Sequence, residues 1–460
     1  MSLELSVTGD AVINGPVSSC TDDGFLDLIE KIRDADVSYT HLETTLHEYD
    51  EPEVIPAATA GGTWMRGPKS VAADLDWAGF NLVSHASNHT LDFSYGGLHE
   101  TLETLDEHGV AYAGTGENLG VASEPTYVNT DCGRVGLVSM SPSCSAWAAA
   151  GHARPDMRGR PGVNALRTYF EVDEDRYEQI RALSQELGYV VMEKDGDDSD
   201  KGCGSTLIVQ TTYSKNEQTR YVQRDDVSGA RRVIDDRDRE RNLRQIRGSA
   251  ETADVTIAHI HSHDFEPNGS RSRPPAFLEI FAKRCVDAGA DVVAVQGSHA
   301  PVRGLEVYEG ALICYDPGDF VIMVDEVTRQ PSDFYYDHEE RLADHPMEAS
   351  LADAIQARGE IKPWRDRESK RDRRTLSPEG DSFAVPGSVL LRCSFDETHS
   401  IAELRLHPFT WIDEPESLTG IPRSATGDRA TEILTRVQEL SAEYGTDVEL
   451  NDGIGSVGIR

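Results

Sequence analysis

The chain has 460 residues, 38% of them hydrophobic, and a formal net charge of −37 at pH 7, from 81 acidic and 44 basic residues. Because this length exceeds that of a usual single domain, we expect one large domain with an appendage, or two domains. The sequence has no basic stripe and no apolar run of about 18 residues, so we expect neither a nucleic-acid partner nor a membrane span.

Acidic residues are dispersed along the whole sequence, and lysine accounts for only 8 of the 44 basic residues. Dispersed like charges repel one another, and a protein tolerates them best where salt screens the repulsion. We therefore predict a haloarchaeal protein from a high-salt cytoplasm. The alternative is an acidic cytosolic protein that works at ordinary ionic strength.

The N-terminus and the cysteines narrow the class of protein further. The first residues lack the basic and apolar regions of a signal peptide, so we expect a cytoplasmic location. The seven cysteines are odd in number and widely spaced, and no C-x-x-C pair occurs. This pattern argues against a disulfide scaffold and against a structural zinc finger.

Strands and helices alternate along the first 300 residues, beginning with an alternating apolar strand at residues 3–8. Further strands are predicted at 37–40, 81–85, 110–114, 135–140, 255–264 and 291–299. Helices are predicted at 25–33, 70–77, 98–108, 174–187, 235–251 and 275–288. Alternation at this spacing indicates βαβ units and an α/β fold.

The remaining segments are loops, hairpins and a charged region. Residues 141–163 are irregular, and a loop of this length is typical of a lid or a substrate wall. A polar turn at 194–204 precedes a hairpin pair at 206–213 and 219–224. Residues 331–383 are highly charged and predict solvated helices or a mobile segment. A second hairpin and the C-terminal elements are predicted at 305–308, 311–315, 389–395, 401–407, 429–444 and 448–450.

Polar side chains of the kinds that bind metals follow five of the predicted apolar strands. They are Asp10, Glu43, Asn88 with His89, His261 with His263, and Gln296 with His299. In open α/β sheets, ligands bind outside the carboxyl ends of the strands, so we expect these side chains to converge. Such a mixture suits a two-metal hydrolytic centre, in which a carboxylate bridges ions about 3.5–4 Å apart and a metal-bound water attacks the substrate. Any one of these residues alone is more often an ordinary turn or capping residue.

Three histidines, His259, His261 and His263, alternate along one predicted strand and therefore point the same way. If the metal-site hypothesis is right, some of these histidines are metal ligands. The alternative is that each is a core histidine whose hydrogen bonds are satisfied inside the protein. A neutral histidine ligand needs an acceptor for its second nitrogen, and Asp92 and Asp264 are the candidates.

Several motifs together resemble one family. They are Gly9-Asp10, Leu42-Glu43, Gly62 to Arg66, Ser87-Asn88-His89-x-Leu91-Asp92, Ile260 to Asp264, Gly289 to Val293, Arg303 to Gly310, Tyr315-x-x-Gly318-Asp319-Phe320 and Leu406-His407-Pro408. In their order and spacing the chain resembles the CapA family of poly-γ-glutamate capsule-synthesis proteins. The resemblance implies a metallophosphoesterase-like α/β fold, a layered sandwich of two mixed β-sheets flanked by helices. We expect one such domain over residues 1–330, the charged segment over 331–383, and strands and a helix over 384–460 that complete the same domain.

The resemblance also implies roles for individual residues. The metal ligands would be Asp10, Glu43, Asn88, His261 and His299, with Glu43 as the bridge and one or two ions of Mn, Zn or Fe. The candidate catalytic residues are His89, a general acid or substrate clamp, and His263, which compensates where a metal site is weakened. Three features depart from the family pattern: His41 replaces the usual Asn, Gln296 replaces a ligand histidine, and Ala300-Pro301 adds a residue before Arg303. Val12 stands where true phosphoesterases have a histidine, as it does in the family generally.

The function implied is metal-dependent hydrolysis, at a phosphoester, amide or peptide bond, in poly-γ-glutamate metabolism. The expected partners are an anionic small molecule or a polyglutamate-type substrate, and other capsule-synthesis proteins. Arg66 and Arg158 are the candidate substrate-binding residues, because guanidinium groups bind carboxylates and phosphates, although each is also consistent with a solvated arginine. The alternatives are a non-catalytic polyglutamate-binding subunit of a polymer synthase and a general phosphoesterase.

Overall fold

The computed structural model of the chain describes residues 2–60, 62–194, 203–211, 218–265, 272–299, 302–361 and 387–459. Most of the predicted polar turn at 194–204 and the part of the charged segment from 362 to 383 lie outside the described residues. Within the described residues, no helix is long and apolar enough to cross a membrane.

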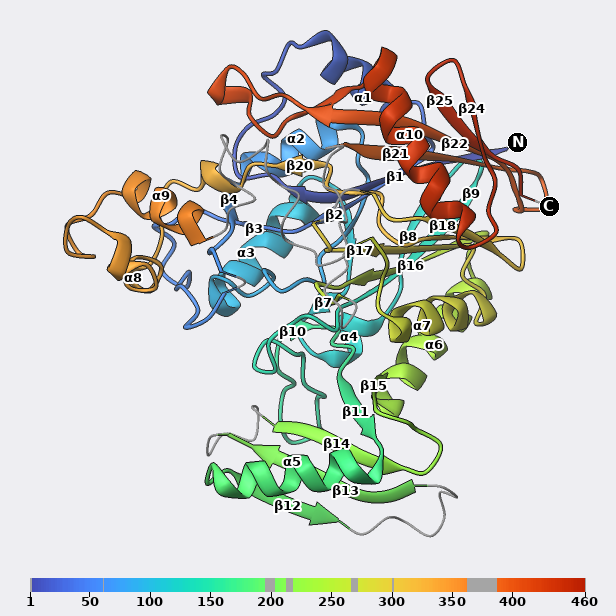
Figure 1. Cartoon of the computed structure of the whole chain (residues 1–460). Coiled ribbons are helices and arrows are strands. Elements are labelled where there is room, and N and C mark those ends of the chain that lie inside the picture. The colour runs from blue at the N-terminus through green and yellow to red at the C-terminus, as the bar shows by residue number, and fades with distance from the viewer. Residues whose placement is uncertain are drawn as a thin grey trace.

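The largest sheet has ten strands and contains both the N-terminal and the C-terminal strands of the chain (Figure 1). Its main path runs β24-β25-β22-β21-β1-β2-β5-β6, with β20 paired to β1 and β23 paired to β22. Strands β1, β2, β5 and β6 are parallel, whereas β21 is antiparallel to β1. The bounds are β1 Leu3–Val12, β2 Val37–Leu42, β5 Leu82–Ser84, β6 Ala111–Ala113, β20 Val321–Ile322, β21 Ser388–Phe395, β22 Ile401–Trp411, β23 Pro422–Ser424, β24 Val448–Asn451 and β25 Ile454–Val457.

A second sheet of six strands packs against the first. Its order is β18-β19-β17-β16-β9-β8, and β9, β16, β17 and β19 are parallel. The bounds are β8 Thr126–Thr130, β9 Gly133–Met140, β16 Val255–His261, β17 Val292–Gln296, β18 Leu305–Tyr308 and β19 Ala311–Cys314. One hydrophobic cluster contains Val7 and Leu391 from the first sheet and Ile257 and Leu312 from the second. The core therefore lies between the two sheets.

Helices cover the outer faces of both sheets. Helices α1 (Asp23–Arg33) and α2 (Ser70–Ala78) share a buried cluster with the first sheet, and α6 (Asp236–Ala250) and α7 (Ala276–Asp287) share one with the second. The other helices are α3 Ser94–Glu107, α4 Leu119–Ser123, α5 Glu174–Glu186, α8 Ser332–Tyr336, α9 Leu351–Ile361 and α10 Gly427–Ala442. The predicted α/β fold of two mixed sheets flanked by helices is confirmed.

Helix α1 shows how the sequence specifies these elements. The Asp22 carboxylate accepts hydrogen bonds from the backbone N–H groups of Gly24 and Phe25, which caps the helix and stabilises it by about 1 kcal/mol. Phe25, Ile29 and Ile32 lie on one face at helical spacing, and all are buried. The apolar residues whose spacing predicts the helix are therefore the residues that pack it against the sheet.

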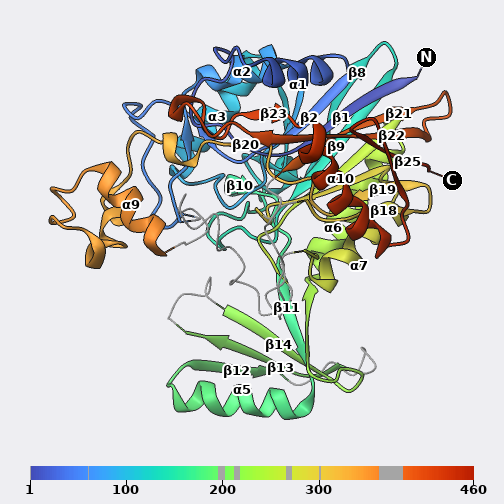
Figure 2. The ribbon, with the colours of Figure 1, turned by 45° about the horizontal axis from the view of Figure 1, so that its top comes forward.

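A five-stranded sheet forms a lobe that projects from the two-sheet body (Figures 1 and 2). Its order is β12-β13-β14-β11-β15, and α5 lies over one face. The strands are β11 Thr168–Val172, β12 Val190–Lys194, β13 Cys203–Gln210, β14 Gln218–Arg224 and β15 Ala230–Ile234. The antiparallel pairing of β13 with β14 confirms the predicted hairpin. The sequence pattern predicts no strand at β11, β12 or β15. The residues of β12 and β15 are largely exposed or half-exposed, whereas three of the five residues of β11 are buried.

Candidate metal centre

The candidate site lies where the parallel strands of both sheets end. Asp10 is in the last part of β1, after a register irregularity between Val7 and Asp10, and Glu43 follows β2 directly. A Cβ atom on Gly9 would lie 1.6 Å from the carbonyl oxygen of Gly318, so only glycine lets β1 approach that loop. This close approach brings Asp10 near Asp319.

Asn88, in the loop after β5, meets two histidines from the second sheet. Its Oδ1 atom lies 2.8 Å from His261 Nε2 and 2.9 Å from His263 Nε2, and the two nitrogens are 3.1 Å apart. The strand predicted at 255–264 is β16 in the structure. It ends at His261, so His263 lies just beyond the strand. The loop that follows β5 in one sheet therefore faces the end of β16 in the other.

Glu43 completes this group. Its Oε1 atom lies 3.4 Å from His261 Nε2, 3.5 Å from His263 Nε2 and 3.6 Å from His299 Nε2. We call Glu43, Asn88, His261, His263 and His299 the outer cluster. A tetrahedral zinc ion with bonds of about 2.0–2.1 Å has ligand atoms about 3.3–3.4 Å apart, which is close to the separations of the three histidine nitrogens from Glu43 Oε1.

Two further groups surround Asp10, which is completely buried. Asp10, His41 and His261 each place a ligand atom within 4.8 Å of the others, and we call these three residues the inner cluster. Asp10, His299 and Asp319 form the other group, in which His299 Nδ1 lies 2.9 Å from Asp319 Oδ1. The centre therefore extends from the solvent side at His299 to the core at His41.

The polar atoms of this centre are buried and unsatisfied. Among the described residues, both carboxylate oxygens of Asp10 and of Glu43, together with His41 Nε2 and His261 Nδ1, have no hydrogen-bond partner. Burying a carboxylate without a partner costs several kcal/mol, which a bound cation offsets. The donor set of carboxylates, an amide and neutral imidazoles is suited to Zn, Mn or Fe. The residues present thus fit a divalent metal.

Burial and mutual charge perturb the pKa values across the centre. Burial, with the charge of Glu43 second, raises the pKa of Asp10 well above its ordinary value. Burial also acts to raise the pKa of Glu43, but His299 and His261 outweigh it and hold that pKa well below its ordinary value. Burial lowers the pKa of His41 to about 3. His41 is consequently neutral at any ordinary pH and can offer a lone pair.

Comparison with known proteins agrees with this arrangement. The family model described as bacterial capsule synthesis protein PGA_cap matches residues 4–323. The chain belongs to this family. Two relatives, the uncharacterized proteins y4sH and y4uA of Sinorhizobium fredii (strain NBRC 101917 / NGR234), are each 28% identical to it over 455 residues, which cover 98% of this chain and 91% of each relative. Both clusters lie inside the part of the chain that matches the capsule-synthesis family.

His89 lies beside the outer cluster in this member of the capsule-synthesis family. Its ring is buried, and its Nδ1 atom lies 2.6 Å from Asp92 Oδ2, which also accepts a hydrogen bond from the backbone N–H of Met65. Burial alone would lower the pKa of His89, but the charge and hydrogen bond of Asp92 raise it above its ordinary value. Asp92 is therefore the acceptor for His89, which is not one of the predicted ligand histidines. The other candidate, Asp264, instead pairs with Arg232 and with Ser262.

The two arginines predicted to bind substrate lie in different surroundings. Arg66 is buried, donates from Nε to the backbone oxygen of His47 at 2.7 Å, pairs with Glu48 and stacks over Tyr49. Arg158 is exposed on the irregular loop 141–163. Neither forms a hydrogen bond or ion pair with the clusters among the described residues, so their roles in the family member stay predictions.

Gln296, which the strand-end pattern groups with ligands, is satisfied in the core. It donates from Nε2 to the backbone oxygen of Thr8 at 2.6 Å and accepts from the Tyr39 hydroxyl at 3.0 Å. His259, from the triple-histidine strand, lies outside both clusters. Its Nδ1 atom lies 2.9 Å from Ser139 Oγ, and its buried Nε2 atom has no hydrogen-bond partner among the described residues.

Two residues of the centre were not predicted as ligands, His41 and Asp319. His41 was noticed only as a departure from the family pattern, and Asp319 only as part of a motif. A signal exists for Asp319: like Asp10, it follows a glycine at the end of an apolar strand. Gly297, two residues before His299, also allows a close approach. Its φ is +99°, and a Cβ atom there would lie 2.8 Å from the ring of His261.

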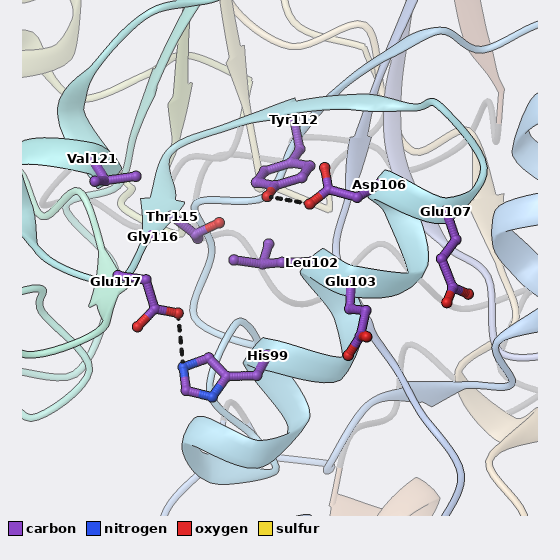
Figure 3. A pocket seen from close by; sticks show the side chains of 10 residues that line it. All are labelled: His99, Leu102, Glu103, Asp106, Glu107, Tyr112, Thr115, Gly116, Glu117 and Val121. Atoms are coloured by element: carbon purple, nitrogen blue, oxygen red, sulfur yellow. Dashed lines mark hydrogen bonds and ion pairs between the residues drawn. The ribbon is translucent and has the colours of Figure 1, made fainter.

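A separate pocket of about 430 Å³ lies between α3 and the segment from β6 to α4 (Figure 3). Its lining includes His99, which pairs with Glu117 at 3.1 Å, and Tyr112, whose hydroxyl donates to Asp106. None of the predicted site residues lines it. This pocket is distinct from the metal centre, and His99 serves below as a control position.

Proposed function

We propose that the chain is a metal-dependent hydrolase of poly-γ-glutamate metabolism that uses one or two divalent ions of Mn, Zn or Fe. The ions would be held by Asp10, Glu43, Asn88, His261 and His299, with His263 completing the outer cluster. The observation that supports this most directly is that the buried carboxylate oxygens of Asp10 and Glu43 have no partner although four neutral or cationic ligand groups face them.

The outer cluster has the openness that a catalytic site requires. The side chains of His263 and His299 are 31% and 37% exposed, whereas those of Glu43 and His261 are completely buried. Catalytic metal sites keep one coordination position open to water or substrate, and the exposed histidines mark that side. An ion bound here would supply a Lewis acid and a water of lowered pKa.

His89 is the proposed general acid. Asp92 holds its Nδ1 atom, which leaves Nε2 for the substrate, and it raises the pKa of the ring above its ordinary value, which favours the protonated form. His89 would donate that proton to the leaving group, while Arg66 and Arg158 would bind substrate carboxylates or phosphates. The hydrogen bond that the Asp92 carboxylate accepts from the backbone N–H of Met65 keeps that carboxylate in place.

The competing function is a non-catalytic polyglutamate-binding subunit. Without a cation, a polyglutamate chain at this centre would meet the buried carboxylates of Asp10 and Glu43, and like charges repel. The same centre with a bound ion attracts a substrate carboxylate and polarises its amide bond. This argument favours the hydrolase.

The test combines metal analysis with turnover of γ-glutamyl peptides and of p-nitrophenyl phosphate. We expect bound transition metal, γ-glutamyl turnover, loss of both in Glu43→Gln, and no change in the control His99→Ala. Turnover of the phosphoester alone would favour a general phosphoesterase. Polyglutamate binding without turnover would favour the accessory subunit, and a metal-free protein whose properties are unchanged by Glu43→Gln would refute the proposal.

A further inference from the structure

His41 occupies an unusual place between two other histidine rings. It lies in β2, is completely buried, and its ring centroid is 4.6 Å from those of both His259 and His261. Its Nδ1 atom lies 2.7 Å from Ser84 Oγ, whereas its Nε2 atom has no hydrogen-bond partner in the part of the chain that the structure describes. The question is which nitrogen carries the proton.

A chain of hydrogen bonds answers it. Gln296 donates to Thr8, so its Oε1 atom is the acceptor for the Tyr39 hydroxyl proton at 3.0 Å. The Tyr39 oxygen, 2.8 Å from Ser84 Oγ, must then accept the single proton of Ser84. Ser84 has no proton left for His41, so its oxygen accepts from Nδ1–H of His41. Neutral His41 therefore carries its lone pair on the unpartnered Nε2.

His261, like His41, has the lone pair of its neutral ring on the nitrogen that faces the core. Its Nε2 atom lies 2.8 Å from Asn88 Oδ1, a carbonyl-type acceptor, so Nε2 carries the proton in the neutral ring. The lone pair is then on Nδ1, which lies 3.8 Å from Asp10 Oδ1 and has no hydrogen-bond partner among the described residues. Asp10, His41 and His261 each place a ligand atom within 4.8 Å of the others, and His41 Nε2, His261 Nδ1 and the Asp10 oxygens are the unpartnered atoms of this inner cluster.

A cation can satisfy all three groups of the inner cluster at once. The inner-cluster atoms have no hydrogen-bond partner among the described residues, and Asp10, His41 and His261 are all completely buried. A water molecule has two protons to donate, which leaves one of three acceptors unpaired. A divalent ion accepts electron pairs from all of them.

We propose that Asp10 Oδ1, His41 Nε2 and His261 Nδ1 hold a second, fully buried divalent cation, with His41 as a ligand. This inference rests on the proposed function, since Asp10 and His261 belong to the same centre. The His261 ring separates the two ions: it would bind the inner one through Nδ1 and donate from Nε2 to Asn88, so the outer ion would be held by the other four residues of the outer cluster, Glu43, Asn88, His263 and His299. Two imidazoles and a carboxylate form a donor set that suits Zn²⁺, and a site closed to water is a structural one.

The experiment counts ions. The purified chain is stripped with a chelator and titrated with Co²⁺, whose absorption reports binding, and its Zn²⁺ content is measured by elemental analysis after reloading. We expect about two equivalents per chain for the parent and about one for His41→Asn. The matched control is His259→Asn, which alters an equally buried neighbouring ring that belongs to neither cluster and should retain about two equivalents.

The outcomes separate this inference from the proposed function. A parent that binds about one equivalent, lost in Glu43→Gln and retained in His41→Asn, refutes the inner ion and leaves the hydrolase proposal intact. A parent that binds none refutes both. If His41→Asn does not fold, Ser84→Ala takes its place: it removes the hydrogen bond that holds His41, so the weaker of the two Co²⁺ binding steps should shift while the other is unchanged, and two unshifted steps would overturn the inference.

Discussion

The Nδ1 atom of His89 lies 2.6 Å from the Oδ2 atom of Asp92, and both side chains are buried. The two residues are three positions apart in the loop between β5 and α3, so one short segment carries both the imidazole and its acceptor. The same carboxylate oxygen accepts the backbone N–H of Met65 at 2.7 Å. Asp92 therefore orients the imidazole and raises its pKa.

Replacing Asp92 by Asn should change the pH profile of hydrolysis. Asn keeps the size of the side chain but removes the charge that raises the pKa of His89. Because the acid must be protonated to act, the high-pH limb of the rate profile should move to lower pH, and the rate at neutral pH should fall about 10- to 100-fold. Metal content, measured by elemental analysis, should not change. An unmoved limb would show that His89 is not the titrating acid.

Removing the metal should destabilise the protein through the outer cluster. A ligand present at 100 times its dissociation constant stabilises the folded state by about 2.7 kcal/mol, so a chelator should lower the melting temperature by several degrees. In Glu43→Gln the chelator should have little effect, because Oε1 of Glu43 faces all three histidines of the cluster. His99→Ala, in the separate pocket, should respond as the parent does. An identical response of all three proteins would refute metal binding at Glu43.

The sequence predicts the outer cluster because of a simple geometric rule. Parallel strands end at one edge, so the polar residues that follow apolar runs, such as Glu43 and His261, must gather there. The same rule does not distinguish Gln296 from a ligand, since its amide partners, Thr8 and Tyr39, come from the opposite sheet. Which atoms meet across two sheets depends on their packing, which no local pattern encodes.

His41 and the lobe illustrate the same limit in two ways. His41 lies in a strand rather than after it, and it joins the centre because the rings of the second sheet stack on it. The lobe strands β12 and β15 are short and largely exposed, so their sequences lack the period-two apolar pattern by which a strand is recognised. Strand pairing within the lobe, rather than burial in the main core, defines these elements.

Asp291 should make stability depend on pH. Burial raises the pKa of this carboxyl group to about 6, although its Oδ2 atom accepts the backbone N–H of Thr256 at 2.8 Å. The unfolded chain ionises Asp291 near pH 3.9, so the folded state binds more protons between about pH 4 and 6 and loses stability as the pH rises through that window. Asn at this position keeps an acceptor and never ionises. Asp291→Asn should therefore be more stable than the parent above pH 6, by about 2–3 kcal/mol, and the advantage should vanish near pH 4.

Urea unfolding at fixed KCl concentration, at several pH values between about 4 and 8, measures this difference. The control is Asp131→Asn, which changes an exposed carboxylate in the turn between β8 and β9 and should give no such pH-dependent gain. A constant difference between Asp291→Asn and the parent at all pH values would show that the carboxyl group titrates normally.

The charge of −37 should make the fold depend on salt. The Debye length falls from about 10 Å at 0.1 M to about 3 Å at 1 M, so molar KCl removes most of the repulsion between surface carboxylates that do not touch. Largely buried ion pairs such as Arg241 with Asp238 are screened far less and oppose the gain little. The melting temperature should rise steadily from low to molar KCl. Sucrose at equal osmolality favours compact states without screening charge, so it separates charge screening from a general solute effect. A protein equally stable without salt would contradict the prediction of a high-salt environment.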